Sequence, residues 1–163
     1  MVSYEDVGAA IDWLSSAFGF RESGERYSDD EGRVTHAELE LDGALVMLGW
    51  PGPDYRSPRR HAEECEQARK WLEVPYVVDG VLIYVDDVDA HCERARAAGA
   101  TILREPKTEP YGRLYNAADL DGHRWMWFQA LLASAPGGAV PQKLPLNVGS
   151  CAWTLIGRSS GWR

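Results

Sequence analysis

The chain has 163 residues, 45% of them hydrophobic and 26% charged, which is the composition of a globular protein large enough for one core. Its formal net charge of −8 argues against a nucleic-acid partner, because phosphates require a basic protein surface. No apolar run reaches the roughly 18 residues of a membrane span, and no basic segment followed by an apolar one marks a secretion signal.

The three cysteines, Cys65, Cys92 and Cys151, have no CxxC spacing. They indicate reduced thiols and not a disulfide framework or a zinc site. We therefore expect a cytoplasmic protein without a membrane partner.

The first predicted helix follows Asp6, whose carboxylate is suited to cap a helix N-terminus. Apolar residues then recur at helical spacing as far as Gly19, where a positive φ ends a helix at little cost. Apolar and polar residues alternate over residues 36–41, which predicts a strand. The LDG triplet at 41–43 indicates a tight turn into the next strand.

A loop rich in proline and glycine begins after residue 50. One short acidic helix is predicted over residues 61–72, within a linker that extends from 51 to 78. The residues beyond 129 are predicted to form a C-terminal extension, 130–163, that opens with a linker rich in proline, glycine and alanine.

The second half of the chain repeats the signals of the first. Asp87 precedes a helical pattern that ends at Gly99, and a second LDG triplet stands at 120–122. The two capping aspartates lie 81 residues apart, the two terminating glycines 80, and the two LDG triplets 79. This nearly constant offset predicts an internal duplication.

The duplication predicts an α+β fold of two tandem βαβββ modules, at residues 1–50 and 79–129. With "YVDDVDA" opening the second module and "DLDGHRW" closing it, the chain resembles the vicinal oxygen chelate superfamily over about residues 1–129. This group contains glyoxalases, bleomycin resistance proteins and extradiol dioxygenases. The resemblance implies that each module forms a curved mixed β-sheet and that the sheets surround a cleft.

The resemblance implies where a metal would bind, namely at one position on the first and one on the fourth strand of each module. In this sequence three of those positions are Met47, Gly80 and Met126, and the remaining one would lie before Met1. Glycine has no side chain to coordinate with, and thioethers are soft ligands that do not suit Zn, Ni, Fe or Mn. We therefore expect neither the family's metal site nor any other cofactor.

Strand alternation predicts which side chains line the cleft. Trp125 and Trp127 are expected to face the helices, and the offset of 79 places Tyr115 in the position that corresponds to His36. The predicted ligand-binding residues are His36, Glu38, Met47, Leu82, Tyr84, Arg113, Tyr115, Arg124, Met126 and Phe128. Of the other histidines, His91 is predicted to be solvated and His123 to be structural.

Three functions remain open at this point. By resemblance to the metal-free drug-binding members, the protein would sequester a small organic ligand, such as a cationic or aromatic natural product, and so confer antibiotic resistance as a homodimer. Alternatively, it would be a lyase, isomerase or dioxygenase-like enzyme that uses His36 and Glu38 with a metal or as an acid–base pair, although solvated strand positions look the same. In the third reading, the cavity of an inert scaffold is filled by its own side chains.

Overall fold

A computed structural model of the chain describes residues 1–74 and 80–131, in which each half folds into a four-stranded sheet with one helix packed on it. The predictions for residues 132–163 lie outside these ranges. The first half comprises β1 (Val2–Ser3), α1 (Val7–Phe18), β2 (Arg21–Ser28), β3 (Val34–Leu41) and β4 (Ala44–Gly49). The second comprises β5 (Gly80–Tyr84), α4 (Val88–Ala97), β6 (Thr101–Glu109), β7 (Gly112–Ala118) and β8 (Arg124–Ala130).

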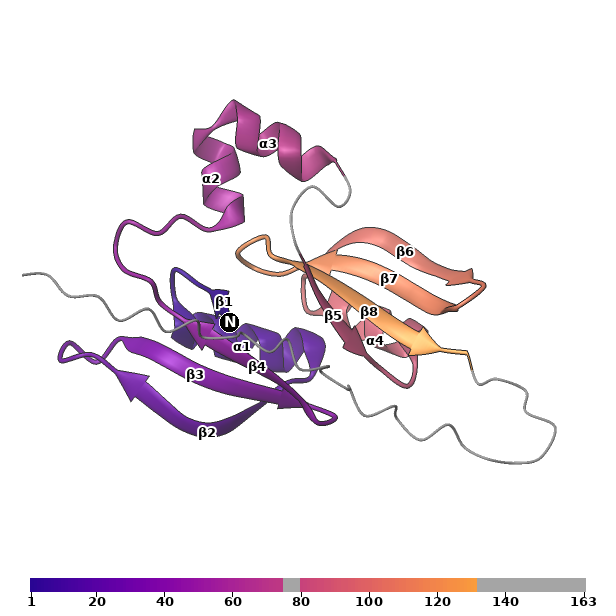
Figure 1. Cartoon of the computed structure of the whole chain (residues 1–163), viewed down its shortest axis with the longest axis horizontal. Coiled ribbons are helices and arrows are strands. Elements are labelled where there is room, and N and C mark those ends of the chain that lie inside the picture. The colour runs from indigo at the N-terminus through magenta and orange to yellow at the C-terminus, as the bar shows by residue number, and fades with distance from the viewer. Residues whose placement is uncertain (75–79, 132–163) are drawn as a thin grey trace, which may run out of the picture. The chain divides into compact units, whose positions relative to one another are not determined.

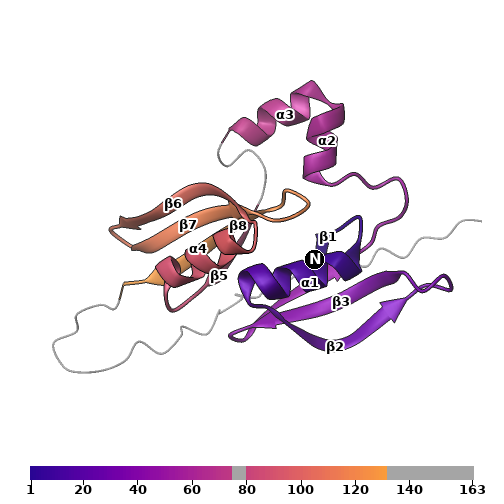
Figure 2. The same cartoon turned by 180° about the vertical axis from the view of Figure 1, so that it is seen from behind.

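The two sheets have equivalent topologies (Figure 1). The strand orders are β1-β4-β3-β2 and β5-β8-β7-β6. In each sheet the first strand pairs in parallel with the fourth, and the other pairs are antiparallel. In each half the helix covers one face of its own sheet, as Figure 2 shows from behind. The predicted α+β fold of two βαβββ units is confirmed.

The helix ends form as their sequences predict. The side chains of Asp6 and Asp87 accept hydrogen bonds from the third backbone N–H beyond them, at 2.9 and 3.0 Å. Gly19 adopts a left-handed φ of 80° and donates to the carbonyl of Ser15. These local contacts set where each helix begins and where α1 ends.

The two β-hairpins that join the third and fourth strands differ in length. Asp42 and Gly43, with φ of 49° and 83°, make a two-residue turn in the first. In the second, Ala118 pairs with Arg124, so five residues form the connection, and the LDG triplet makes its predicted turn within it, with the Gly122 N–H (φ 85°) donating to the carbonyl oxygen of Asp119. The three extra residues change the register of β7 relative to the prediction.

The connection between the halves contains two helices, α2 (Pro58–Glu64) and α3 (Glu66–Glu73), instead of the one predicted over 61–72. Ser57 caps α2, and a proline stands in the first turn, where its missing N–H costs no hydrogen bond. Cys65 has extended backbone angles, φ −135° and ψ 115°, which end α2 and begin α3.

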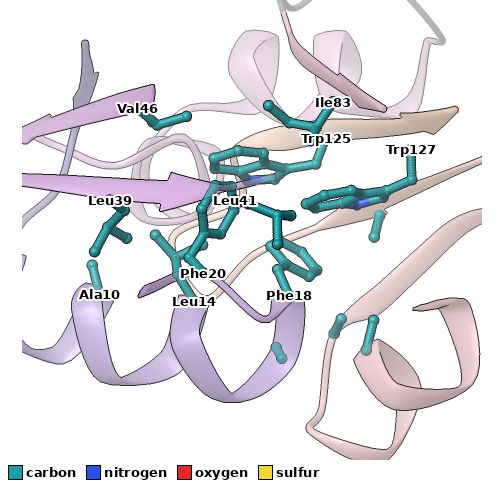
Figure 3. Packing of buried hydrophobic residues seen from close by; sticks show 14 of the residues in the cluster. Ala10, Leu14, Phe18, Phe20, Leu39, Leu41, Val46, Ile83, Trp125 and Trp127 are labelled. Atoms are coloured by element: carbon teal, nitrogen blue, oxygen red, sulfur yellow. The ribbon is translucent and has the colours of Figure 1, made fainter. Parts of the chain in front are cut away.

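The helix-facing sides of both sheets share one hydrophobic core. Rings from the two halves meet there, with Phe18 lying 4.7 Å from Trp127 and Phe20 lying 5.6 Å from Trp125 between ring centroids (Figure 3). Both tryptophans are fully buried, as predicted. Since each large buried ring contributes about 2–3 kcal/mol, this contact accounts for much of the cohesion between the halves.

Candidate functional site

The face of each sheet opposite the shared core, here called its open face, carries most of the predicted ligand-binding residues. On the first sheet Glu38 pairs with Met47, and His36 lies one pair further along the same face. Met47 is 41% exposed, and the ring of His36 lies 5.9 Å from that of Tyr27. This open face is therefore polar and acidic, with an exposed thioether.

The open face of the second sheet is richer in aromatic residues. Leu82 and Tyr84 of β5 pair with Met126 and Phe128 of β8, which places all four on one side. The ring of Phe128 contacts Tyr84 edge-on at 5.2 Å and stacks parallel to Tyr111 at 6.1 Å. These three residues, Tyr84, Tyr111 and Phe128, are called the ring cluster below.

A glycine makes room for the ring cluster. A Cβ at Gly112 would lie 2.2 Å from Cζ of Phe128 and 2.7 Å from the carbonyl oxygen of Gln129. Real Cβ atoms do not approach other atoms so closely, so only glycine permits this position of the Phe128 ring. Tyr111, which precedes this glycine at the tip of the β6–β7 hairpin, was not predicted to take part.

The predicted orientation of Arg113 and Tyr115 is wrong. Tyr115 pairs with Trp127 on the core side and is fully buried. Arg113 lies on the same side, where its guanidinium forms two hydrogen bonds of 2.7 Å with Asp89 of α4. The long β7–β8 connection causes the error, because a shift of one residue exchanges the two faces of a strand.

Leu114 and Asn116 take the places assigned to Arg113 and Tyr115. Asn116 pairs with Met126, as Glu38 pairs with Met47 in the first sheet. The open face of the second sheet thus loses two predicted polar groups and gains one amide. Leu114 and Asn116 could be placed on the open face only from the strand pairing, which depends on the length of the β7–β8 connection.

His36 and Glu38 share a face, yet no hydrogen bond joins their side chains in the structure described. Within residues 1–74 and 80–131 no group of three or more His, Cys, Asp or Glu side chains is arranged to hold a metal ion. The described residues at which the resemblance implies metal ligands are Met47, Gly80 and Met126, and thioethers with a glycine do not suit a hard or borderline metal. No helix among the described residues is long and apolar enough to cross a membrane.

Two hollows lie apart from most of the predicted set. One, of about 690 Å³, is lined by Glu5, Arg33, Trp50, Tyr55 and Arg60, among others. In this hollow Arg60 lies 3.2 Å from Glu5, and the Arg33 guanidinium lies over the Trp50 ring at 4.3 Å. The other, of about 480 Å³, includes Arg124 from the predicted set.

A buried polar network around Asp119 joins the two halves and was not predicted from the sequence. The Asp119 carboxylate, 1% exposed, accepts hydrogen bonds from the Tyr4 hydroxyl at 2.6 Å and from Trp125 Nε1 at 2.9 Å. Burial, and after it the Asp119 charge, raises the pKa of Tyr4 well above its ordinary value. His123 lies with Nε2 2.7 Å from the carbonyl oxygen of Ser3, so its structural role is as predicted.

The prediction that His91 is solvated is wrong, because it is only 4% exposed. Its Nε2 lies 3.0 Å from the carbonyl oxygen of Phe18, so this nitrogen carries the proton and Nδ1 accepts from the Tyr115 hydroxyl at 2.6 Å. Burial lowers the pKa of His91 from 6.5 to about 4, and Arg94 acts in the same direction. The neutral ring therefore holds α4 against the end of α1.

This arrangement predicts a pH dependence of stability. Because the folded-state pKa lies below the unfolded value, the stabilisation is complete above pH 6.5 and declines as the pH falls toward 4. Relative to a His91→Gln variant, which lacks the titrating ring, the free energy of unfolding should fall by about 3 kcal/mol between pH 7.5 and pH 4. Urea titrations of both proteins would measure this, and parallel pH profiles would contradict it.

The sequence of residues 1–127 matches the family model of the Glyoxalase/Bleomycin resistance protein/Dioxygenase superfamily. An uncharacterized protein of Mycobacterium bovis is 30% identical over 126 residues, covering 74% of this chain and 74% of that protein. An uncharacterized protein of Mycobacterium tuberculosis H37Rv is 30% identical over 126 residues, covering 74% of this chain and 66% of that protein.

Solved structures share the same fold. TioX from Micromonospora sp. ML1 has a TM-score of 0.57 and 32% identity, over 81% of this chain and 94% of that one. A glyoxalase/bleomycin resistance protein from Streptomyces sp. CB03234 has a TM-score of 0.55 and 25% identity, over 78% and 95%. TnmS3, an antibiotic binding protein from the same Streptomyces strain, has a TM-score of 0.55 over 80% and 91%, and its 24% identity shows likeness of fold alone.

Proposed function

Because the chain belongs to the Glyoxalase/Bleomycin resistance protein/Dioxygenase superfamily, we propose that it is a cytoplasmic binding protein that sequesters a small organic ligand. It would hold the ligand without chemical change, as a step in resistance to a toxic natural product. The likeness to a glyoxalase/bleomycin resistance protein from Streptomyces sp. CB03234, at 25% identity, supports a function within this group. The same fold also occurs in TnmS3, an antibiotic binding protein.

The observation that carries the proposal is the exposed ring cluster. Tyr84 is 60% exposed and Tyr111 is 65% exposed, although both contact Phe128 on the open face of the second sheet. Exposed aromatic side chains that gather on one surface mark binding sites more often than structural ones. Their parallel and edge-on rings suit a flat organic ligand, which would stack on them.

The proposal includes a homodimer, because each open face would supply half of a cleft. On the first sheet Glu38 and Glu40 give the open face a negative charge, beside the exposed Leu45 and Met47. If the first sheet of one copy faces the second sheet of its partner, a two-fold axis creates two equivalent clefts. Each would combine a negative wall with an aromatic wall, which favours a flat cation.

The donor set at the family's metal positions supports binding without a metal. A lyase, isomerase or dioxygenase-like enzyme would instead need His36 and Glu38 to act on a metal or as an acid–base pair. Elemental analysis of purified, untagged protein tests this choice, with a His36→Ala variant as control. We expect no stoichiometric metal, even after incubation with Zn, Ni, Fe and Mn, whereas metal bound by the wild type and absent from the variant would favour the enzyme.

A further inference from the structure

The hollow of about 480 Å³ lies between the α2–α3 pair and one end of the second sheet. Leu72 of α3 and Ala62 of α2 form one wall. Thr101, Leu103 and Ala118 form the other, from strands β6 and β7. Its volume is within the range of small-molecule sites, and one chain builds it, so it requires no dimer.

Two arginines fasten the helices over this end of the sheet. Arg124 of β8 donates from its two terminal nitrogens to the carbonyl oxygens of Leu72 and Val74, at the end of α3. Arg59 of α2 donates to the carbonyl oxygen of Asp119 at 3.2 Å, and its backbone N–H donates to Asp121 at 2.9 Å. These hydrogen bonds join α2 and the end of α3 to the second half of the chain, and both arginines also line the hollow.

The charge of the lining is opposite to that of the protein. Arg59, Arg69 and Arg124 line the hollow with one carboxylate, Glu63, in a chain of net charge −8. Arg59 and Arg124 are bonded to backbone carbonyls, which do not neutralise them. Within residues 1–74 and 80–131 the Arg69 guanidinium has no hydrogen-bond or ion-pair partner.

The lining of the hollow also has an apolar part. Leu103 of β6 is 46% exposed, and the other residues of this strand are mostly polar. It faces the hollow together with Leu72, so an apolar group placed there would remove both side chains from water.

We propose that this hollow is a second binding site, which takes an organic anion with a compact apolar body. The carboxylate of such a ligand pairs with Arg69, in the net positive field of Arg59 and Arg124, and its body packs on Leu72 and Leu103. The site differs in charge preference from the cleft proposed for cations, and its residues do not include the ring cluster.

Titration calorimetry with 2-naphthoate tests the proposal, with 2-naphthylmethylammonium as the probe of equal shape and opposite charge. The anion should bind to the full chain, and the cation should bind at this site at least tenfold more weakly. Arg69→Glu should weaken naphthoate binding by at least tenfold, because it replaces the pairing group with a like charge. Lys70→Glu changes the net charge equally on the neighbouring residue, which does not line the hollow, and should leave affinity within about twofold.

Absence of naphthoate binding would overturn the proposal, as would equal losses in the Arg69 and Lys70 variants. Circular dichroism of both variants establishes that α3 remains folded, and Arg69→Gln provides a milder change if Arg69→Glu unfolds it. A Phe128→Ala variant separates the two sites. It should retain naphthoate binding, and loss of that binding would show that the anion occupies the open face instead.

Discussion

Replacing Asp119 by alanine is expected to lower the free energy of unfolding by about 3–5 kcal/mol. Its carboxylate is the acceptor for the Tyr4 hydroxyl, for Trp125 Nε1, and for the backbone N–H groups of Asp121 and His123. Without this carboxylate, the four donors would lose their hydrogen-bond acceptor in a site that is shielded from water. Since Tyr4 lies in the first half and Asp119 in the second, the loss weakens the joint between them. Urea denaturation followed by circular dichroism measures it.

Two matched variants control this prediction. Asp86→Ala removes an exposed carboxylate on the same half and should change stability by less than about 0.5 kcal/mol. Tyr4→Phe removes one donor and leaves the carboxylate in place, so it should cost about 1 kcal/mol. If Asp119→Ala were no more harmful than Tyr4→Phe, the network would not join the halves as described.

The second large effect concerns the ring cluster. Phe128→Ala should weaken the binding of a flat cationic ligand such as proflavine by about thirtyfold, which corresponds to about 2 kcal/mol. The substitution removes the ring that both Tyr84 and Tyr111 contact, so the stacking surface is lost as a unit. Titration calorimetry of wild type and variant gives the ratio of dissociation constants.

Trp71→Ala is the control for this binding experiment. Trp71 is 49% exposed on α3, so the variant removes an exposed aromatic side chain that does not belong to the ring cluster. We expect its affinity for proflavine to equal that of the wild type within about twofold. Equal losses in the two variants would indicate nonspecific association with exposed rings and would contradict the proposed cleft.

Much of the fold was predictable because its signals are local. A capping aspartate, apolar residues at helical spacing and a glycine at the helix end each act over a few residues, and all recur after about 80 residues. Alternation along β8 likewise placed Trp125 and Trp127 on the core side, since a strand has a period of two. These features need no knowledge of distant contacts.

The wrong predictions concern features that depend on contacts between residues far apart in the sequence. The second LDG triplet looks like the first, but Asp119 folds its own backbone into a longer connection by accepting from Asp121 and His123. That change of register moved Arg113 and Tyr115 to the core side. Similarly, the burial of His91 depends on the Phe18 carbonyl in the other half of the chain, which helical spacing within α4 does not reveal.

The measurement that tests the central claim most directly is the titration of metal-free protein with proflavine, with its stoichiometry compared to the oligomeric state from sedimentation. We predict saturable binding of two ligands per dimer after treatment with a chelator, unchanged by added Zn, Ni, Fe or Mn. Binding that appears only when one of these metals is restored would contradict the account and would favour an enzyme that uses His36 and Glu38. Absence of saturable binding under both conditions would contradict a cleft for flat cations.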